Sequence, residues 1–299
     1  MIFWYSAEYQ NIAIAGAWLC NIFYMEYLDD LLYRSGNGVQ EKINYIKKEG
    51  KEKLHLVLDF DRTLTPSRNA KGNEIATWKL LNKRLPPEKK AVATALYEKY
   101  RPREIAGKMT AGDAADWWSS CLNLYQDDVL KWSDLIDEVE NTIPIRPGVK
   151  EIFEICAKEE IPTIIISAGI KNVIDLWCQK FKIKPTIILS TELCFNGRGY
   201  VCGWDKDSLI HVLNKHEAVH QELSKTRKNR PNVILIGDSI DDAAMVDGGE
   251  GVLKCIVDDP RNDDVRDALF CEKIFAKFDL ILRGESLSPI AKIIKKIIQ

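Results

Sequence analysis

The segment Asp59-Phe60-Asp61 places two carboxylates two residues apart, directly after an apolar run at residues 54–58. Side chains at this spacing point in the same direction while the chain remains extended. Two carboxylates in a dry crevice repel each other and require a cation, and Mg²⁺ accepts oxygen ligands while leaving positions for a phosphate. Asp59 can then attack phosphorus to form a phosphoaspartate, and Asp61 can protonate the leaving oxygen and later activate water.

Other polar residues suited to phosphoryl transfer follow a second apolar run, at residues 163–166, or lie further along the chain. The hydroxyl of Ser167 and the backbone amide of Gly169 can donate hydrogen bonds to phosphoryl oxygens. Lys215 can neutralise the charge that builds on the equatorial oxygens during transfer. These residues predict a phosphate-binding site beside the two carboxylates.

A third apolar run, at residues 233–236, lies just before Asp238, and Asp242 follows at the start of a predicted helix. Asp238 can supply a metal ligand from another strand end, and Asp242 can hold Lys215 or a metal-bound water. Each of these motifs is common by itself as a loop acid or a helix cap, so the prediction depends on their joint occurrence in order. The predicted Mg²⁺ ligands are Asp59, Asp61, Asp238 and Asp242.

Continuous apolar, β-branched runs are typical of strands buried on both faces of a parallel sheet. The runs at residues 186–189 and 253–257 are the fourth and fifth candidates. Helical patterns separate the runs, at residues 149–158, 170–181 and 207–223. This alternation predicts an α/β fold with a doubly wound, Rossmann-like parallel sheet, in which ligands gather at the carboxyl ends of the strands.

Residues 67–145 interrupt the alternation of strands and helices with consecutive helical patterns, around residues 76–85, 87–100, 111–124 and 125–139. Because they fall between the first and second strands, they predict an inserted helical cap above the strand ends that carries substrate specificity. The Rossmann-like core then comprises residues 39–66 and 146–299.

Residues 1–38 form an N-terminal extension that is expected to be helical or poorly ordered. Its apolar stretch is interrupted by Asn21 and Glu26 and falls short of the roughly 20 residues that a membrane-spanning helix needs. A secretory signal lacks its positive segment, because the first basic residue is Arg34. We therefore expect no membrane association, and a membrane anchor remains the alternative.

The composition is that of an ordinary globular protein, with 46% hydrophobic residues, 29% charged residues and a formal net charge of −2. This balance argues against a nucleic acid polymer as partner. The eight cysteines are scattered without a CxxC pair, which favours free thiols and a cytoplasmic location. A monomer is expected. The cysteines are Cys20, Cys121, Cys156, Cys178, Cys194, Cys202, Cys255 and Cys271.

Taken in order, these motifs resemble those of the haloacid dehalogenase superfamily. The second Asp of the first motif, Asp61, lies two residues after the nucleophile and resembles the phosphatase branch of that superfamily. The segments at residues 209–216 and 284–287 are similar to the cytosolic pyrimidine 5′-nucleotidase family, which includes the 7-methylguanosine phosphate-specific 5′-nucleotidases. The resemblance covers residues 39–299 and implies Mg²⁺, a nucleoside monophosphate substrate and a phosphate site. The residues implied for phosphate binding are Thr63, Ser167, Ala168 and Gly169.

In the cap, the segment ending at Glu104 resembles the family segment whose last Glu contacts the base, and Asp116-Trp117-Trp118 resembles another. Stacking of a base on an aromatic ring contributes about 1–3 kcal/mol, and a positively charged 7-methylguanine adds cation–π attraction. Adjacent residues on a helix do not share a face, so we expect Trp117 to contact the base in preference to Trp118. The alternative is that both tryptophans pack a small cap core.

Departures from the family pattern, including Arg62 and residues 108–112, leave open the choice between a pyrimidine and 7-methylguanine. Another small phosphate monoester such as phosphoserine is the alternative substrate. A nucleotide-binding protein without turnover is a further alternative, although such a protein needs no nucleophile.

Residues 216–220 spell HExxH, the signature of a zinc metalloprotease, in which His216 and His220 would share a helix face with Glu217 as base. The surrounding residues are polar and no third ligand is evident downstream. An exposed polar helix face is the simpler interpretation, and the protease remains a remote alternative.

Overall fold

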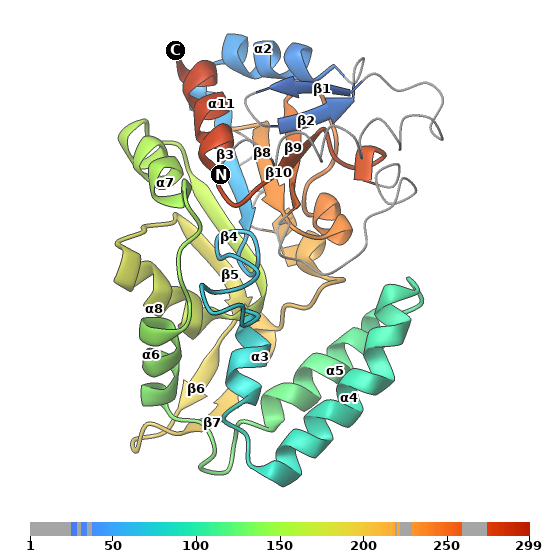
Figure 1. The fold of residues 1–299 in the computed structure, drawn as a ribbon, viewed down its shortest axis with the longest axis vertical. Helices are drawn as coiled ribbons and strands as arrows, with labels where there is room; N and C mark the ends of the chain where they lie inside the picture. The colour runs from blue at the N-terminus through green and yellow to red at the C-terminus, as the bar shows by residue number, and fades with distance from the viewer. Residues whose placement is uncertain (1–24, 29–30, 35–37, 219, 222–228, 259–273) are drawn as a thin grey trace, which may run out of the picture.

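The computed structural model describes residues 25–28, 31–34, 38–218, 220–221, 229–258 and 274–299. In this part of the chain an eight-stranded sheet lies between helices (Figure 1). From β10 to β5 its strands are parallel, so the predicted doubly wound α/β fold is confirmed. In spatial order the strands are β1 (Met25–Leu28), β2 (Leu31–Arg34), β10 (Leu280–Arg283), β9 (Val252–Asp258), β8 (Asn232–Gly237), β3 (Leu54–Asp59), β4 (Thr163–Ile170) and β5 (Ile187–Thr191).

Both faces of the sheet are buried, which explains why its strands read as continuous apolar runs. Along β3, Leu56 and Leu58 belong to one apolar cluster and Val57 belongs to another on the opposite face. Helices supply the first cluster with side chains from α2 (Val39–Glu49), α7 (Val149–Lys158), α8 (Lys171–Phe181) and α11 (Ser288–Ile298). The second cluster includes Met245 and Phe278.

The N-terminal segment is the main correction to the predicted organisation. Its described residues are not helical: β1 and β2 pair with each other and β2 pairs with β10, all antiparallel, so they extend the core sheet. Strands of four residues carry too little periodicity to be recognised in the sequence, and β10 was missed for the same reason. The rest of the extension lies outside the described residues.

Between β3 and β4 the chain forms the four expected helices, with somewhat different bounds. They are α3 (Thr77–Asn82), α4 (Pro87–Ile105), α5 (Ala111–Asn123) and α6 (Trp132–Asn141). The helices α4 and α5 lie side by side and project away from the sheet, whereas α6 packs against α8 of the core (Figure 1). The division of the chain at residue 145 therefore stays a prediction.

A short hairpin of β6 (Leu193–Phe195) and β7 (Val201–Trp204) follows β5 and was not expected from the sequence. The strand β7 contacts α5, so the hairpin lies against the inserted helices. The described residues also form three 3₁₀ helices: η1 (Lys51–Lys53), η2 (Lys206–Ser208) and η3 (Ile240–Met245).

The helix predicted over residues 207–223 is wrong in its first half. The chain forms η2 and a turn there, and regular helix begins only at Lys215 among the described residues. The side chain of Asn214 causes the delay, because Oδ1 accepts from the His211 amide (2.7 Å) and Nδ2 donates to the Leu209 carbonyl (2.8 Å). Asn side chains commonly compete with helix hydrogen bonds in this way.

Within the described ranges, no helix combines the length and the apolar character needed to cross a bilayer. The apolar stretch for which a membrane anchor was the alternative spans residues 11–28, and all of it except Met25–Leu28, which form β1, lies outside the described residues.

Candidate active site

Strand register brings the predicted polar residues to one edge of the sheet. In the β3–β4 pairing Asp59 lies opposite Ile166, so Ser167 follows at nearly the same level. On the other side β3 pairs with β8, which ends at Gly237, so Asp238 emerges beside Asp59. The carboxyl ends of parallel strands therefore place a carboxylate, a hydroxyl and a second carboxylate together, as the sequence predicts.

These strand ends open into a cavity of about 1230 Å³ that reaches the inserted helices. A cavity of this size accommodates a nucleotide-sized ligand, since typical ligand sites measure roughly 300–1,000 Å³. Thr63 is fully buried and is not among the lining residues, so the structure does not bring it to the cavity. The other predicted site residues all line it: Asp59, Asp61, Glu104, Trp117, Trp118, Ser167, Ala168, Gly169, Lys215, Asp238 and Asp242.

Lys215 bridges two buried carboxylates at the floor of the cavity. Its Nζ donates to Asp59 Oδ1 at 2.6 Å and to Asp242 Oδ1 at 2.8 Å. Burial alone would lower the pKa of Lys215, but the charges of Asp242 and Asp59 outweigh this effect and raise it. Lys215 is therefore a permanent cation next to the proposed nucleophile.

Asp242 is held by the backbone as well as by Lys215. Its Oδ2 accepts hydrogen bonds from the amides of Asp238 (3.1 Å) and Ser239 (3.0 Å) at the start of η3. These bonds direct its other oxygen towards Lys215. Asp242 thus contacts Lys215, one of the two partners considered for it in the sequence, and its role as a metal ligand stays a prediction.

Gly237, the last residue of β8, leaves room for the Asp242 side chain. A Cβ at Gly237 would lie 2.5 Å from Asp242 Oδ2 and 2.6 Å from its Cβ, closer than real contacts allow. We expect Gly237→Ala to displace Asp242, loosen Lys215, reduce kcat/KM at least about 10-fold and destabilise the fold by about 1–3 kcal/mol. Phosphate release and thermal unfolding measure the two effects.

Gly203 provides the matched control, because it also lies in a strand and a Cβ there meets nothing within 4 Å. Equal losses in Gly203→Ala and Gly237→Ala would contradict the assignment of Gly237 to the support of Asp242.

Asp61 is oriented by the first residue of α3. Its Oδ1 accepts from the amide and from the hydroxyl of Thr77, each at 3.0 Å. Burial raises the pKa of Asp61, although the two bonds from Thr77 oppose the shift. A raised pKa suits a carboxyl group that must give and then take a proton near neutral pH.

The carboxylates of Asp59, Asp238 and Asp242 each place an oxygen within 4.8 Å of the other two. Burial, followed by the charge of Asp242, raises the pKa of Asp238 to about 7, and burial also raises that of Asp59. Three crowded carboxylates beside Lys215 are a donor set that fits a divalent cation. Asp61, predicted as a fourth ligand, is not in this group, because its carboxylate faces Thr77.

The phosphate-binding segment is tied to the inserted helices. Two indole groups, Nε1 of Trp78 and Nε1 of Trp118, both donate to the Ala168 carbonyl at 2.8 Å. Within the segment, the Gly169 amide donates to Ser167 Oγ at 3.0 Å. The helices α3 and α5 are thus fixed to the segment expected to bind the phosphate.

Trp117 and Trp118 both line the cavity although they are adjacent on α5, and which of them contacts the base stays a prediction. Both side chains are largely buried, and Trp117 stacks on Tyr100 of α4 with ring centroids 5.7 Å apart at 20°. The cavity runs along α4, whose lining residues extend from Lys90 to Ile105, and it also borders α5 at Trp117, Trp118 and Cys121. Glu104, also on its wall, is paired with Arg101.

The segment at residues 108–112, noted as a departure from the family pattern, contains the turn at which α5 begins. Thr110 and Asp113 form a capping box, in which Thr110 Oγ1 accepts from the Asp113 amide and Asp113 Oδ2 accepts from the Thr110 amide, each at 3.1 Å. The cap determines where α5 begins and hence which of its residues reach the cavity.

Arg62 was noted in the sequence only as a departure from the family pattern, but it lines the cavity. Its backbone adopts a left-handed conformation with φ of 61°, and its guanidinium pairs with Glu74 at 2.6 Å. The left-handed turn at Arg62 therefore directs a second cation, in addition to Lys215, towards the carboxylates of the cavity.

Arg146 was not singled out in the sequence. It supports the turn at residues 62–65, which directly follows Asp61. It is fully buried, and its guanidinium donates to the carbonyls of Thr63 (2.8 Å), Arg62 (2.6 Å) and Thr65 (3.2 Å). The sequence offers only one signal for this role, an Arg between Pro144 and Pro147 where the chain returns to the core.

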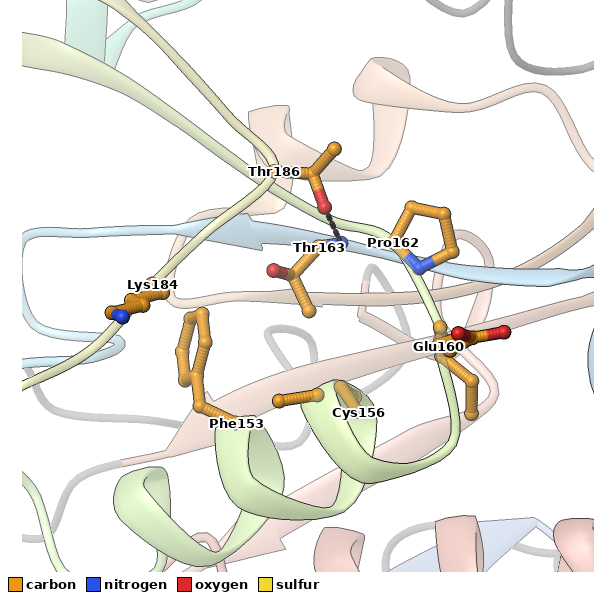
Figure 2. A pocket seen from close by; sticks show the side chains of 9 residues that line it. Phe153, Cys156, Glu160, Pro162, Thr163, Lys184 and Thr186 are labelled. Atoms are coloured by element: carbon orange, nitrogen blue, oxygen red, sulfur yellow. Dashed lines mark hydrogen bonds between the residues drawn. The ribbon is translucent and has the colours of Figure 1, made fainter.

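A second, smaller cavity of about 210 Å³ lies between α7 and the amino end of β4 (Figure 2). Thr186 Oγ1 accepts from the Thr163 amide at its edge. Thr163 begins β4, whereas Ser167 lies towards its other end, so this cavity is separate from the predicted site.

The HExxH residues lie outside the large cavity. His216 and His220 do not line it, although Lys215, which begins the same helix, does. The large cavity therefore gives no support to the metalloprotease interpretation.

A doubly wound sheet with paired carboxylates, a lysine and a further carboxylate at its strand ends defines a phosphatase of the haloacid dehalogenase superfamily. A phosphoserine phosphatase structure shares this fold, with a TM-score of 0.52 at 16% identity over 82% of this chain and 98% of that chain. The model of the family described as pyrimidine 5′-nucleotidase (UMPH-1) matches residues 62–298, and the chain belongs to this family. It is a phosphoric monoester hydrolase of the 5′-nucleotidase type, as the motifs predicted.

Individual relatives share most of their length with the chain. It is 29% identical over 281 residues to 7-methylguanosine phosphate-specific 5′-nucleotidase A of Xenopus laevis, covering 89% of this chain and 95% of that protein. Identity to the Homo sapiens 7-methylguanosine phosphate-specific 5′-nucleotidase is 28% over 280 residues, covering 90% and 92%. The structure of cytosolic 5′-nucleotidase IIIB bound to cytidine matches with a TM-score of 0.72 at 26% identity, covering 90% and 94%.

Proposed function

We propose that the protein is a Mg²⁺-dependent 5′-nucleotidase that hydrolyses a pyrimidine or 7-methylguanosine 5′-monophosphate through a phosphoaspartate on Asp59. The observation that carries this proposal is a single cavity. Asp59, Lys215 and Asp238 line it at the edge of the sheet, and the aromatic side chains of Trp117 and Trp118 line it at the inserted helices. The names of the relatives support both kinds of base. Residues 67–145 are proposed as the cap that selects among them.

In the proposed reaction, a carboxylate oxygen of Asp59 attacks phosphorus and the bond from phosphorus to the 5′ oxygen breaks. Its electron pair leaves with that oxygen, which takes a proton from Asp61, and the nucleoside departs. Water then attacks the phosphoaspartate while Asp61 accepts its proton, the bond from Asp59 to phosphorus breaks, and inorganic phosphate leaves. Thr77 holds Asp61 in place for both transfers.

Charge on the transferring phosphoryl group is stabilised by Lys215, which Asp59 and Asp242 keep in position. Ser167 and the backbone of the 167–169 segment are proposed to donate to its oxygens. Asp59 and Asp238 would hold the Mg²⁺, with Asp242 beside them. When bound, the ion neutralises the phosphate oxygens and offsets the repulsion among the carboxylates.

The proposal is tested by phosphate release from 7-methylguanosine monophosphate, cytidine monophosphate and phosphoserine, each with Mg²⁺ and with a chelator. We expect release from at least one nucleotide, loss of release with the chelator, and recovery with Mg²⁺. Preference for phosphoserine would contradict the proposed role of the cap. Better recovery with Zn²⁺ than with Mg²⁺ would contradict the proposed metal.

Base selection is tested at Glu104. The N1 and N2 groups of 7-methylguanine both donate hydrogen bonds and its ring is cationic, whereas cytosine offers only its amino group to a carboxylate. Charged hydrogen bonds contribute about 1.5–3 kcal/mol. We therefore expect Glu104→Gln to reduce kcat/KM for 7-methylguanosine monophosphate by about 10–100-fold and for cytidine monophosphate by less.

Glu98→Gln is the matched control, because Glu98 lies on the same helix but is exposed and does not line the cavity. Equal effects of Glu104→Gln on the two nucleotides would assign Glu104 to the structure of the cap and not to the base.

A cytoplasmic location is likewise our proposal, supported by the name of the cytosolic 5′-nucleotidase IIIB relative.

A further inference from the structure

A cluster of three metal-ligating side chains lies apart from the nucleotidase site. Ligand atoms of His216, His220 and Asp247 all lie within 4.8 Å of one another. Asp247 Oδ1 is 3.6 Å from His216 Nε2, and its Oδ2 is 3.2 Å from His220 Nε2. The two imidazole rings are 4.4 Å apart between centroids. None of the three residues lines the large cavity.

Tertiary structure supplies the third member of this cluster. His216 and His220 are four residues apart on a helix and therefore share a face. Asp247 follows η3, on the far side of β8 in the sequence, and reaches the same face. The ligand that the HExxH motif lacks in the sequence is thus present in space.

The geometry points to a second metal site: we propose that His216, His220 and Asp247 bind Zn²⁺ through two imidazole nitrogens and one carboxylate oxygen. Zinc takes this kind of three-residue ligand set and completes a tetrahedron with water. Mg²⁺ prefers oxygen ligands throughout, so the nitrogen pair separates this site chemically from the carboxylate site around Asp59.

Solvent reaches the cluster directly, because the side chains of His216, His220 and Asp247 are 40%, 46% and 60% exposed. A metal ion can therefore enter without opening the fold. An exposed His–Asp ion pair contributes only about 0–1 kcal/mol to stability. Ion pairing alone is therefore a weak reason for both histidines to face the same carboxylate.

A metal at this site would join two segments that position catalytic groups. The helix of His216 and His220 begins at Lys215, and Asp247 follows η3, which carries Asp242. Lys215 and Asp242 already contact each other. We therefore propose that Zn²⁺ stabilises this junction and does not cleave peptides, since none of its three ligand residues lines the large cavity.

The test measures zinc binding by tag-free protein at saturating Mg²⁺, using equilibrium dialysis followed by metal analysis. We expect one Zn²⁺ per chain that excess Mg²⁺ does not displace, and an increase of ~5 °C in the unfolding midpoint at 100 times Kd. His220→Ala and Asp247→Ala each remove a ligand, and each is expected to weaken zinc binding by at least ~100-fold, more than loss of an outer-shell partner costs.

Glu217→Gln is the control, because Glu217 belongs to the HExxH motif but not to the cluster, and we expect it to bind zinc normally. Without zinc, His220→Ala and Asp247→Ala should retain wild-type phosphate release, which shows that they fold. Co²⁺ should give visible absorption bands that are lost in both variants. Zinc binding that persists in His220→Ala, that Mg²⁺ displaces, or that never reaches one ion per chain would overturn the proposal.

Discussion

Asp59→Asn is expected to abolish phosphate release, lowering kcat by on the order of 10⁴–10⁶-fold, the range known for loss of a covalent nucleophile. An amide is neutral and does not attack phosphorus, and no phosphoenzyme can form. The fold should persist, because Asn retains the carbonyl oxygen that accepts from Lys215 and removes one charge from a crowded group. Phosphate release and acid-quenched labelling with a radiolabelled nucleotide measure the two consequences.

The matched control for this substitution is Asp127→Asn. Asp127 is 84% exposed and has φ of 63°, a conformation that Asn also tolerates. Its variant should release phosphate and incorporate label as the wild type does. Substantial turnover or retained labelling in Asp59→Asn would remove Asp59 from its assigned role.

Lys215→Met is expected to lower kcat by about 10²–10³-fold, the usual cost of losing one donor to transition-state charge. It should also destabilise the metal-free protein by about 3–5 kcal/mol at neutral pH, because buried Asp59 and Asp242 lose their shared cation. Phosphate release and urea unfolding at a series of pH values measure the two effects.

The loss of stability in Lys215→Met should depend on pH. Burial already raises the pKa of Asp59 and brings that of Asp238 to about 7, and removal of the lysine raises both further. A carboxyl group with a raised folded-state pKa stabilises the fold when protonated, below its unfolded pKa of about 4. The deficit of the variant is therefore smallest near pH 4 and grows as the pH rises through the raised values.

Lys295→Met controls for the loss of an ordinary salt bridge. Lys295 Nζ lies 2.6 Å from Glu151, the same distance as in the Lys215–Asp59 pair, but it is 49% exposed. Its loss should cost at most about 1 kcal/mol. The loss in free energy of unfolding in Lys215→Met could prove independent of pH, or no larger than that in Lys295→Met. Either result would show that burial does not strengthen the contribution of Lys215 to stability.

The chemistry of the site could be predicted from the sequence because it depends on residue types placed directly after recognisable strands. Asp59, Ser167 and Asp238 each follow an apolar run that is buried on both faces, and such runs belong to parallel sheets. Parallel strands present their carboxyl ends at one edge, so the convergence of these residues follows from local patterns alone. Family membership and enzyme class rest on the same motifs.

Side-chain direction within the cap could not be predicted in this way. Whether Trp117 and Trp118 both border the cavity depends on how α4 and α5 pack, and Trp118 is turned by its bond to the Ala168 carbonyl, far away in the sequence. Thr63 was predicted to reach the site, and the structure buries it elsewhere. The motif implies a phosphate contact, but the turn that Arg146 supports keeps its side chain buried.

The sequence by itself determined the α/β class, the inserted helices and the position of the proposed nucleophile, because each depends on local periodicity or on residue type at a strand end. Tertiary structure alone decided that β1 and β2 join the sheet, that Asp61 faces Thr77, and that Asp247 meets His216 and His220. These contacts join segments distant in the sequence. Their formation depends on the packing free energy of the whole fold, which no local pattern encodes.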